Sequence, residues 1–444
     1  MLIDFSIQNF MSFNTRQELS MVASSSTTED YNDENTCSIN KFGITNVLKS
    51  AAVFGANASG KSNLVRSLKT LKDIILNSLD SVGENKLKTA IPFLLKEDIF
   101  DQPTEFEISF IANNTLYRYG LSILNSEIEE EWLYWTKSAR ETMLFHRNKQ
   151  HVKFNQRSFS EAKDFVRKKD DSYEIEKTRT NVPFITVLSQ FNGEKSTNIV
   201  NWFLKLNIIS GLNDNGFKEF TIKLFESNSK FKQWALNILS SLQIQDVMVK
   251  ETDVEFPLTQ KISDLSDELQ VAANKLHDFY EKNKSILKEK RLEVIKNNPI
   301  SKESYSLPFS LESEGTRKLI YLLGPIFDII NNKEILIIDE FDNKFHTLLC
   351  KFIISLYHKF SESGSQIIMT CHDTNLLTRE LFRRDQIWFI EKNSANESQL
   401  YGLLEYKEYY TRKSDSYNKD YLAGKYGAIP LFNSLDEIGA ILND

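Results

Sequence analysis

Cysteine is scarce in this sequence, which has three such residues among 444. Cys37, Cys350 and Cys371 are far apart, so they have neither the paired spacing of a zinc site nor the framework of a disulfide-rich protein. Long apolar runs are missing too, because no stretch reaches the roughly 18 apolar residues that a membrane-spanning helix needs. These absences predict a cytoplasmic protein in a reducing compartment, with no membrane partner.

An excess of positive charge is also absent. Asp and Glu number 61 against 54 Lys and Arg, so the formal net charge is −7. A chain of this sign has no global electrostatic attraction to nucleic acid, and any contact with DNA needs a local basic patch. Apolar residues make up 41% of the chain, which is enough for a substantial core. Residues 2–7 alternate between apolar and polar, as in a strand and unlike a signal peptide.

A phosphate-binding loop is the most informative feature that is present. Residues 55–62 read GANASGKS and match the pattern G-x-x-x-x-G-K-[ST] at every fixed position. The apolar stretch 50–54 predicts a buried strand before the loop, and apolar residues recur at helical spacing from 63 to 75. This strand, loop and helix form the context in which such a loop holds nucleotide phosphates at a helix N-terminus, which argues against a chance match.

The chemistry of the loop assigns a task to each residue type. Glycines at 55 and 60 allow successive N–H groups to turn towards phosphate oxygens. Lys61 would reach the β- and γ-phosphates, and the Ser62 hydroxyl would hold Mg²⁺. We therefore expect ATP and Mg²⁺ as ligands. The predicted nucleotide-binding residues are Gly55, Asn57, Ser59, Gly60, Lys61, Ser62 and Asn63.

Two further apolar runs, at 334–338 and 367–370, predict buried strands that end in polar residues. The first leads into Asp339, which would bind Mg²⁺ together with Ser62, and Glu340, which would polarise the attacking water. The second leads to His372, at a strand's carboxyl end, where open α/β sheets bind ligands. Taken alone, each pattern also has a structural explanation. Together they make Glu340 and His372 the predicted catalytic residues.

Residues 313–316, SEGT, precede a predicted helix at about 317–330. Ser313 can be a plain N-cap of that helix. With Gly315 it can equally bind an anion, through N–H groups and the helix dipole. The sequence leaves both interpretations open.

In this order the motifs resemble those of the ABC-type ATPase superfamily, on its SMC, RecF and OLD side. The resemblance implies two heads that face each other and trap ATP between them. Ser313 and Gly315 would then contact the partner's γ-phosphate as a signature motif, and Asp342 would line the dimer seam as the D-loop residue. Residues 312–316 depart from the family's LSGGQ, with Glu312 for leucine and Glu314 for the first glycine, which argues against a transporter subunit.

Three segments, 9–13 (NFMSF), 313–316 and 421–430 (YLAGKYGAIP), point to one smaller family within this superfamily. They are similar to a bacterial family of stand-alone, OLD-like ATP-binding proteins that includes RloA, the AbiL-type ATPase and AriA of the PARIS anti-phage system. Membership would imply an ATP-hydrolysing sensor or regulatory subunit of an abortive-infection-type defence system. Its partners would be a separate effector such as a TOPRIM-type nuclease, a phage-encoded trigger and further copies of itself, at least an ATP-sandwiched dimer and up to a hexamer.

A second hypothesis is a DNA-repair or DNA-remodelling ATPase of the RecF or SMC kind. It predicts ATPase activity that DNA stimulates and a basic surface across the dimer, and the acidic net charge counts mildly against it. Contact with nucleic acid therefore stays open. A protein with a dead nucleotide site is a further alternative, against which the intact Lys61, Asp339 and Glu340 speak.

The expected fold class is α/β, an ABC-type P-loop ATPase head of two lobes with a helical insertion. We expect an ATPase lobe with an antiparallel β-layer at 1–140, a mainly helical insertion or arm at 141–300, and a second ATPase lobe with the C-terminal tail at 301–444. Within the insertion, residues 262–296 predict a long helix with a heptad seam, which would be a surface helix or a short arm. Residues 421–430 predict a loop, either plain or a docking point for a partner.

Overall fold

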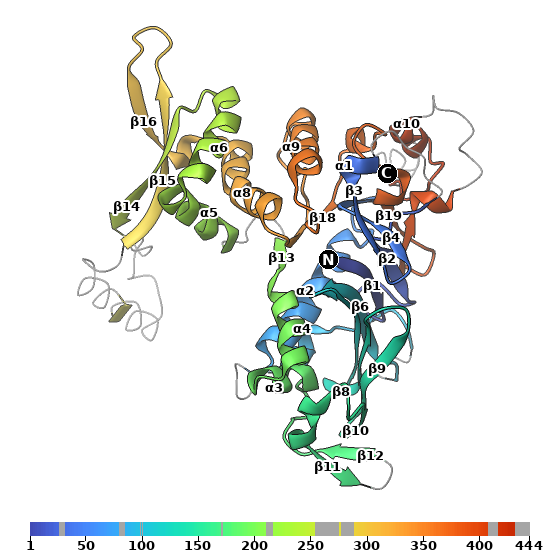
Figure 1. Ribbon diagram of the computed structural model, residues 1–444. Coiled ribbons are helices and arrows are strands. Elements are labelled where there is room, and N and C mark those ends of the chain that lie inside the picture. The colour runs from blue at the N-terminus through green and yellow to red at the C-terminus, as the bar shows by residue number, and fades with distance from the viewer. Residues whose placement is uncertain are drawn as a thin grey trace. The chain divides into compact units, whose positions relative to one another are not determined.

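The computed structural model describes residues 1–25, 32–79, 85–97, 99, 101–169, 172–209, 216–253, 275–276, 288–406 and 416–430. The chain divides into two compact units (Figure 1). The first comprises Met1–Asn213 and Asp328–Asp444, and the second comprises Asp214–Phe327. Within the described ranges, no helix is both long and apolar enough to cross a membrane.

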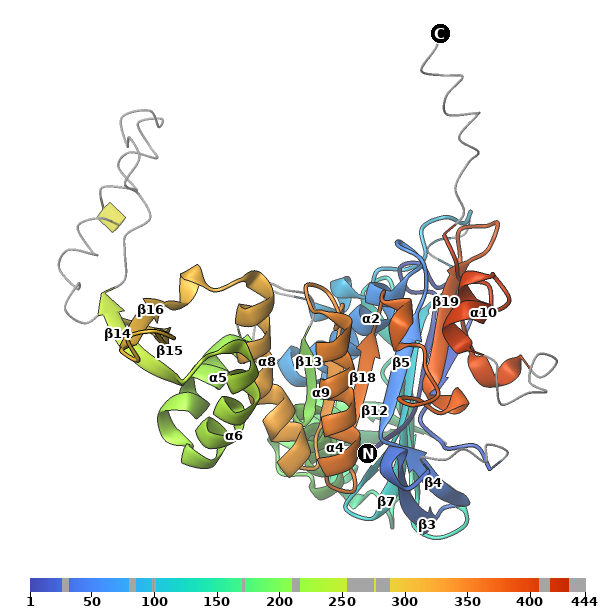
Figure 2. The same ribbon diagram turned by 90° about the horizontal axis from the view of Figure 1, so that it is seen from above.

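A six-stranded sheet in the first unit has the order β13-β17-β18-β5-β19-β20, and its central strands can be followed in Figure 2. The strands from β13 to β19 run parallel, and β20 pairs antiparallel with β19 at the edge. Every residue of β5, β17 and β18 is buried, as expected for aliphatic strands covered on both faces. The bounds are β5 Ser50–Phe54, β13 Leu206–Ile209, β17 Ile335–Ile338, β18 Gln366–Thr370, β19 Ile387–Lys392 and β20 Ser398–Gly402.

The order of this sheet brings three distant loops together. Strand β18 pairs with β17 on one side and with β5 on the other, all in parallel. Because the carboxyl ends of parallel neighbours meet at the same edge, the loops after these three strands begin side by side. The predicted strands at 50–54, 334–338 and 367–370 are confirmed, and so is the α/β class.

A nine-stranded antiparallel sheet forms the second layer of this unit, in the order β11-β12-β10-β9-β8-β7-β6-β1-β2. Its strands β6 to β8 alternate between buried and half-buried residues over much of their length, so one face packs on the core. This confirms the antiparallel layer expected at 106–134. The bounds are β1 Leu2–Gln8, β2 Gln17–Ser20, β6 Thr104–Ala112, β7 Thr115–Leu124, β8 Glu127–Thr136, β9 Glu141–Asn148, β10 His151–Phe154, β11 Val166–Lys169 and β12 Ser172–Ile175.

The helices of the first unit are short except where they cover the sheets. Helix α2 starts inside the phosphate loop, and its buried residues, among them Leu64, Leu68 and Leu71, recur at intervals of three and four. The bounds are α1 Asn32–Asn35, α2 Lys61–Asn77, α3 Phe184–Gln190, α4 Glu194–Leu204, α9 Thr347–Phe360 and α10 Tyr417–Leu422, with a small hairpin of β3 Thr36–Lys41 and β4 Ile44–Leu48. The predicted helix at 63–75 is thereby confirmed.

A fully buried ion pair ties β8 and β9 to the start of α3. The guanidinium of Arg147 donates from Nη1 to Glu131 at 3.3 Å and to the Val182 carbonyl at 2.8 Å. Glu131 accepts from the Phe184 N–H at 2.6 Å and the Ile185 N–H at 3.2 Å. Neither side chain is exposed to solvent, so each charged group is the counter-ion of the other.

The C-terminal segment packs on the six-stranded sheet. The ring of Phe389 in β19 stacks on Tyr421 and Tyr426, with centroids 5.4 and 5.6 Å apart. Tyr421 belongs to the end of α10, so the predicted loop at 421–430 begins with helix rather than with a turn. Gly424 and Gly427 then adopt φ angles of 77° and 65°, which fit the turn expected beyond the helix.

The second unit combines α5, α6 and most of α8 with a three-stranded antiparallel sheet of order β14-β15-β16. The Tyr321 carbonyl of α8 accepts a hydrogen bond from Thr221 of α5, and Phe327 of α8 packs edge-on against Phe231 of α6. The bounds are α5 Gly216–Ser227, α6 Ser229–Leu239, β14 Asp246–Asp253, β15 Lys288–Asn297, β16 Ser304–Pro308 and α8 Glu314–Asn331. Helix α8 confirms the helix expected at 317–330.

Two expectations for residues 141–300 are corrected. Within its described residues the segment is not mainly helical, because β9 to β12 continue the nine-stranded sheet up to Ile175 and β14 pairs antiparallel with β15. The long helix predicted at 262–296 is wrong from Lys288 onwards, where β15 begins. There Leu292 and Val294 are buried with Glu293 between them, so a period of two replaces the heptad. Of the remainder of this predicted helix, only 275–276 lies within the described residues.

Candidate functional site

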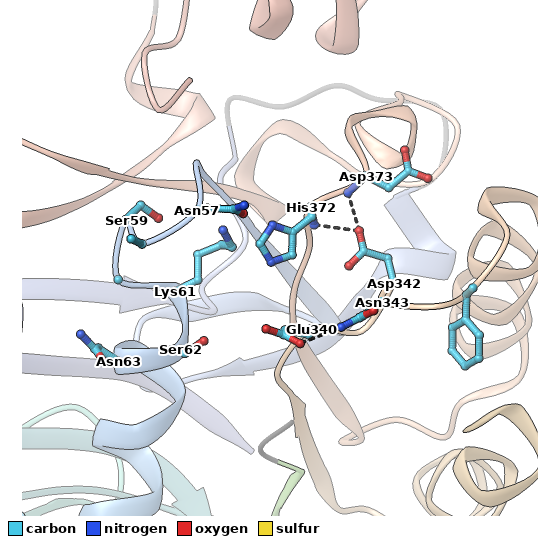
Figure 3. Close-up of a pocket in the computed structure, with 13 residues that line it drawn as sticks. Asn57, Ser59, Lys61, Ser62, Asn63, Glu340, Asp342, Asn343, His372 and Asp373 are labelled. Atoms are coloured by element: carbon cyan, nitrogen blue, oxygen red, sulfur yellow. Dashed lines mark hydrogen bonds between the residues drawn. The ribbon is translucent and has the colours of Figure 1, made fainter. Parts of the chain in front are cut away.

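A pocket of about 970 Å³ opens where the loops after β5, β17 and β18 meet (Figure 3). It brings together most of the residues that the sequence singles out. Asp339, which follows β17, and Gly55, which begins the loop after β5, are close in sequence to lining residues but do not line the pocket themselves. Ser313 and Gly315 belong to the second unit and do not line this pocket. The lining residues are Asn57, Ala58, Ser59, Gly60, Lys61, Ser62, Asn63, Glu340, Asp342, Asn343, Phe345, His372 and Asp373.

The phosphate loop is shaped so tightly that its two fixed glycines have no room for a side chain. A Cβ at Gly55 would lie 2.2 Å from the Ile390 carbonyl oxygen, and one at Gly60 would lie 2.3 Å from Ser398 Oγ. Gly60 also has a φ of 118°, which other residues rarely adopt. The loop backbone is therefore held in the tight conformation in which such a loop can turn N–H groups towards an anion.

The side chain of Lys61 folds back onto the phosphate loop. Its ammonium donates to the Gly55 carbonyl at 2.6 Å and to the Ala56 carbonyl at 3.0 Å. Burial lowers the pKa of Lys61, while the nearby carboxylates of Asp342, Asp339 and Glu340 act in the opposite direction. A buried cation beside a set of N–H donors is an arrangement that binds phosphate.

The loop is also held from outside by two serines that sequence reasoning missed. Ser398, in β20, donates from Oγ to the Ser59 carbonyl at 2.5 Å and from its N–H to the Ser12 carbonyl at 2.7 Å. Ser12 Oγ accepts from the Asn63 side chain at 2.8 Å. Ser12 lies in the NFMSF segment, which the resemblance had noted, whereas no local pattern distinguishes Ser398.

The carboxylates after β17 are fixed by the neighbouring strand. Thr370 donates from its hydroxyl to Asp339 Oδ1 at 2.7 Å and accepts from the Glu340 N–H at 2.8 Å. Glu340 has a φ of 52°, in the left-handed region, which costs a non-glycine residue of order 1 kcal/mol. Asn343 donates to Glu340 Oε2 at 2.9 Å. Thr370 and Asn343 together hold this strained residue, so that the Glu340 carboxylate stays in the pocket.

His372 is placed by Asp342, whose Oδ2 accepts from the His372 N–H at 2.7 Å and also from the Asp373 N–H. Burial lowers the pKa of His372, and the charge of Lys61 adds to this, so the neutral imidazole is favoured. In Figure 3 the ring lies between Lys61 and Asp342. Asp342, expected at a dimer seam, thus lines the pocket of its own chain.

The donor set fits a nucleotide with Mg²⁺. Ser59 Oγ and Asp342 Oδ1 are buried without a hydrogen-bond partner, and both residues line the pocket. Such atoms are rare in folded proteins and indicate a ligand or ordered water that satisfies them. A hydroxyl at Ser62 and a carboxylate at Asp339 supply the hard oxygen ligands that Mg²⁺ prefers, and Lys61 with the loop N–H groups would hold phosphates.

Known structures that resemble this chain include two heads of SMC proteins, both at low identity. One is described as "SMC head domain from Thermotoga maritima", with a TM-score of 0.41, 11% identity, and coverage of 90% of this chain and 98% of that one. The other is "Crystal structure of the SmcHead bound to the C-winged helix domain of ScpA", with a TM-score of 0.42, 12% identity, and coverage of 90% and 97%. A search of curated proteins finds no match.

A family model matches residues 50–378, which span all three loops of the pocket. Its description is "AAA domain, putative AbiEii toxin, Type IV TA system". The match begins at the first residue of β5 and ends just beyond His372, so it covers the nucleotide site and about three quarters of the chain. The chain therefore belongs to this family of AAA-domain ATPases.

Proposed function

We propose that this protein hydrolyses ATP and serves as a sensor or regulatory ATPase of a bacterial anti-phage defence system. The observation that carries the proposal is the meeting of Lys61, Glu340 and His372 in one pocket, although the first lies almost 280 residues before the second. A phosphate-binding cation, a carboxylate and an imidazole are groups that can support phosphoryl transfer to water.

The roles follow from the geometry of the pocket. The loop N–H groups and Lys61 would bind the phosphates, and Ser62 and Asp339 would hold Mg²⁺, which would supply charge neutralisation at the phosphates. Glu340 orients and polarises the attacking water, and His372 contacts the γ-phosphate. The products are ADP and phosphate. Catalysis here is mostly positioning, which agrees with the number of contacts that fix Glu340 and the His372 loop.

The proposed assembly is a homo-oligomer, at least a dimer with ATP between two heads. The resemblance to ABC-type heads supports it, with Ser313 and Gly315 of one chain at the γ-phosphate held by another. In the structure the Ser313 hydroxyl accepts from the Thr316 N–H at 3.1 Å, which is a cap at the start of α8.

Two findings support a role in defence. The family description names a toxin of a toxin–antitoxin system. The segments NFMSF, SEGT and YLAGKYGAIP resemble the family of RloA, the AbiL-type ATPase and AriA. We infer that a phage-encoded trigger acts on the ATPase in the cytoplasm, and that the toxic activity resides in a separate effector such as a TOPRIM-type nuclease. ATP binding and release would gate that effector through opening and closing of the heads.

The test begins with turnover of the purified protein. Glu340→Gln should bind ATP but hydrolyse it at least 100-fold more slowly, because the amide cannot accept a proton from water. Lys61→Ala should lose ATP binding altogether. Release of phosphate and binding of a fluorescent ATP analogue measure the two properties. Glu340→Gln turnover at the wild-type rate would show that another group activates the water.

The same Glu340→Gln protein, tagged and recovered from its bacterial host in the presence of ATP, tests the defence role. A co-purifying nuclease without DNA supports the sensor proposal. DNA without a protein partner, together with ATPase activity that DNA stimulates, would replace it with a repair or remodelling function. Lys61→Ala is the matched control, since a partner of the ATP-bound state should be absent from its eluate.

A further inference from the structure

Asp342 lies in the loop after β17, two residues beyond Glu340. It is almost completely buried, with an exposed fraction of 7%. One of its carboxylate oxygens, Oδ2, accepts two backbone N–H groups, from His372 and from Asp373. These hydrogen bonds are charge-assisted, which makes them stronger than bonds between neutral groups. Asp342 therefore joins the loop after β17 to the loop after β18 at the point where each one reaches the pocket.

The other oxygen of the same carboxylate faces the pocket. Oδ1 is buried and has no hydrogen-bond partner, and Figure 3 shows it turned towards the side where His372, Lys61 and Glu340 lie. Phosphate oxygens accept hydrogen bonds and cannot pair with it. The partner that satisfies it in the loaded site is therefore a hydrogen-bond donor or a cation, and not a phosphate oxygen.

Asp373 is held from a second direction as well. Its side chain accepts from the Thr347 hydroxyl at the start of α9, and it caps the short turn at 374–376 by accepting from the Asn375 N–H at 2.9 Å. The loop that carries His372 is thus fixed on the far side by Asp373 and on the pocket side by Asp342. Removing Asp342 frees the pocket side while the rest of the loop stays anchored.

We propose that Asp342 is a positioning residue of the nucleotide site within its own chain, and that it sets His372 against the γ-phosphate by holding the loop backbone. The inference rests on the proposed hydrolysis of ATP. It differs from the seam role that the resemblance implies, because the hydrogen bonds that define it are made inside one head. It requires an acceptor oxygen at position 342 more than it requires a charge.

Three variants and one double variant test it: Asp342→Ala, Asp342→Asn, His372→Ala, and Asp342→Ala combined with His372→Ala. Asp342→Ala should lower kcat roughly 30- to 100-fold with little change in ATP affinity, because two charge-assisted hydrogen bonds to the loop are lost. Asp342→Asn should recover most of this loss, since the amide oxygen can accept the same two N–H groups. In the His372→Ala background, Asp342→Ala should change kcat by less than about 3-fold, because a residue that acts through His372 has nothing left to position.

The inference is overturned if the losses of the two single variants multiply in the double variant, or if Asn is as poor as Ala. It is also overturned if Asp342→Ala abolishes ATP-dependent association in the Glu340→Gln background, because a seam residue would behave in that way. Circular dichroism and thermal unfolding check each variant. If Asp342→Ala does not fold, the same cycle run with Asp342→Asn decides, since any loss independent of His372 contradicts the inference. An inactive wild-type protein would instead contradict the proposed function itself.

Discussion

At the scale of single residues, the side chains that line the pocket are held in place mainly by residues that do not line it themselves. Thr370 is fully buried, yet its hydroxyl fixes both the Asp339 carboxylate and the Glu340 N–H. The left-handed backbone of Glu340 is stable because those partners compensate for its strain. The arrangement of the two acids therefore depends on one hydroxyl group on the neighbouring strand.

Thr370→Val tests this dependence, because valine has the same shape without the hydroxyl. The change leaves the Glu340 N–H and Asp339 Oδ1 without their partner, at a cost of about 1–3 kcal/mol. We expect ATP turnover to fall about 10-fold or more and the Mg²⁺ concentration for half-maximal activity to rise. A Mg²⁺ titration of phosphate release measures both.

Thr370→Ser is the matched control, since it keeps the hydroxyl and should retain most of the activity. Equal losses in the Val and Ser variants would show that packing of the Thr370 methyl group, and not its hydroxyl, sustains the site.

The sequence alone was enough to predict the residues proposed to act on the nucleotide. The loop after β5 and the acids after β17 belong to sequence motifs in which each residue type is needed for phosphate or Mg²⁺ binding. The sequence could not predict the residues that hold them. Ser398 contacts the phosphate loop across more than 330 positions of sequence, and such a contact exists only once the sheet order is known. Asp342 was found in the sequence, but its hydrogen bonds to the His372 loop come from the pairing of β17 with β18.

At the scale of elements, runs of apolar residues in the sequence correctly predicted the strands that are buried on both faces, which are β5, β17 and β18. Local patterns failed for β15, where residues 288–296 contain alternating charges that also fit an amphipathic helix. The segment is a strand because β15 pairs with β14 on one side and with β16 on the other. A helix could not have formed the backbone hydrogen bonds with both neighbouring strands. The strands β9 to β12 were missed for a related reason, because three of them are only four residues long.

The buried pair of Arg147 and Glu131 gives a prediction at this scale. Arg147→Ala should lower the free energy of unfolding by about 3–5 kcal/mol, because it leaves the Glu131 carboxylate buried and without its counter-ion. Arg118→Ala is the control. Arg118 pairs with Glu107 and Glu141 in the adjacent sheet region, but its side chain is about one-third exposed, so the expected loss is about 1 kcal/mol or less.

Urea denaturation followed by circular dichroism compares the two variants. Similar midpoints for Arg147→Ala and Arg118→Ala would mean that water reaches Glu131 once the guanidinium is gone. In that case the pair would not anchor α3 to the sheet.

At the scale of the whole molecule, the residues proposed to complete the nucleotide site lie in different units. Lys61, Glu340 and His372 belong to the first unit, and Ser313 with Gly315 to the second. A site completed in trans makes association depend on ATP, because the phosphate would be the shared ligand of two chains.

Ser313→Asp tests this dependence in the Glu340→Gln background. Aspartate keeps the N-cap of α8 but places a negative charge where the partner's γ-phosphate would bind. We expect the variant to bind ATP with unchanged affinity and to remain a monomer, whereas the parent associates when ATP is added. Light scattering after gel filtration gives the mass, and ATP-dependent association of Ser313→Asp would remove Ser313 from the interface.

The position of β5 has a consequence for how the protein is made. Its neighbours in the sheet are β18 and β19, which begin at residues 366 and 387, and its loop is held by Ser398. A ribosome that has synthesised the first 300 residues has already released the whole phosphate loop, but neither strand that flanks it. The nascent chain can therefore place β5 between its two partner strands only after residue 392 has been synthesised, and Ser398 can hold the phosphate loop only after that.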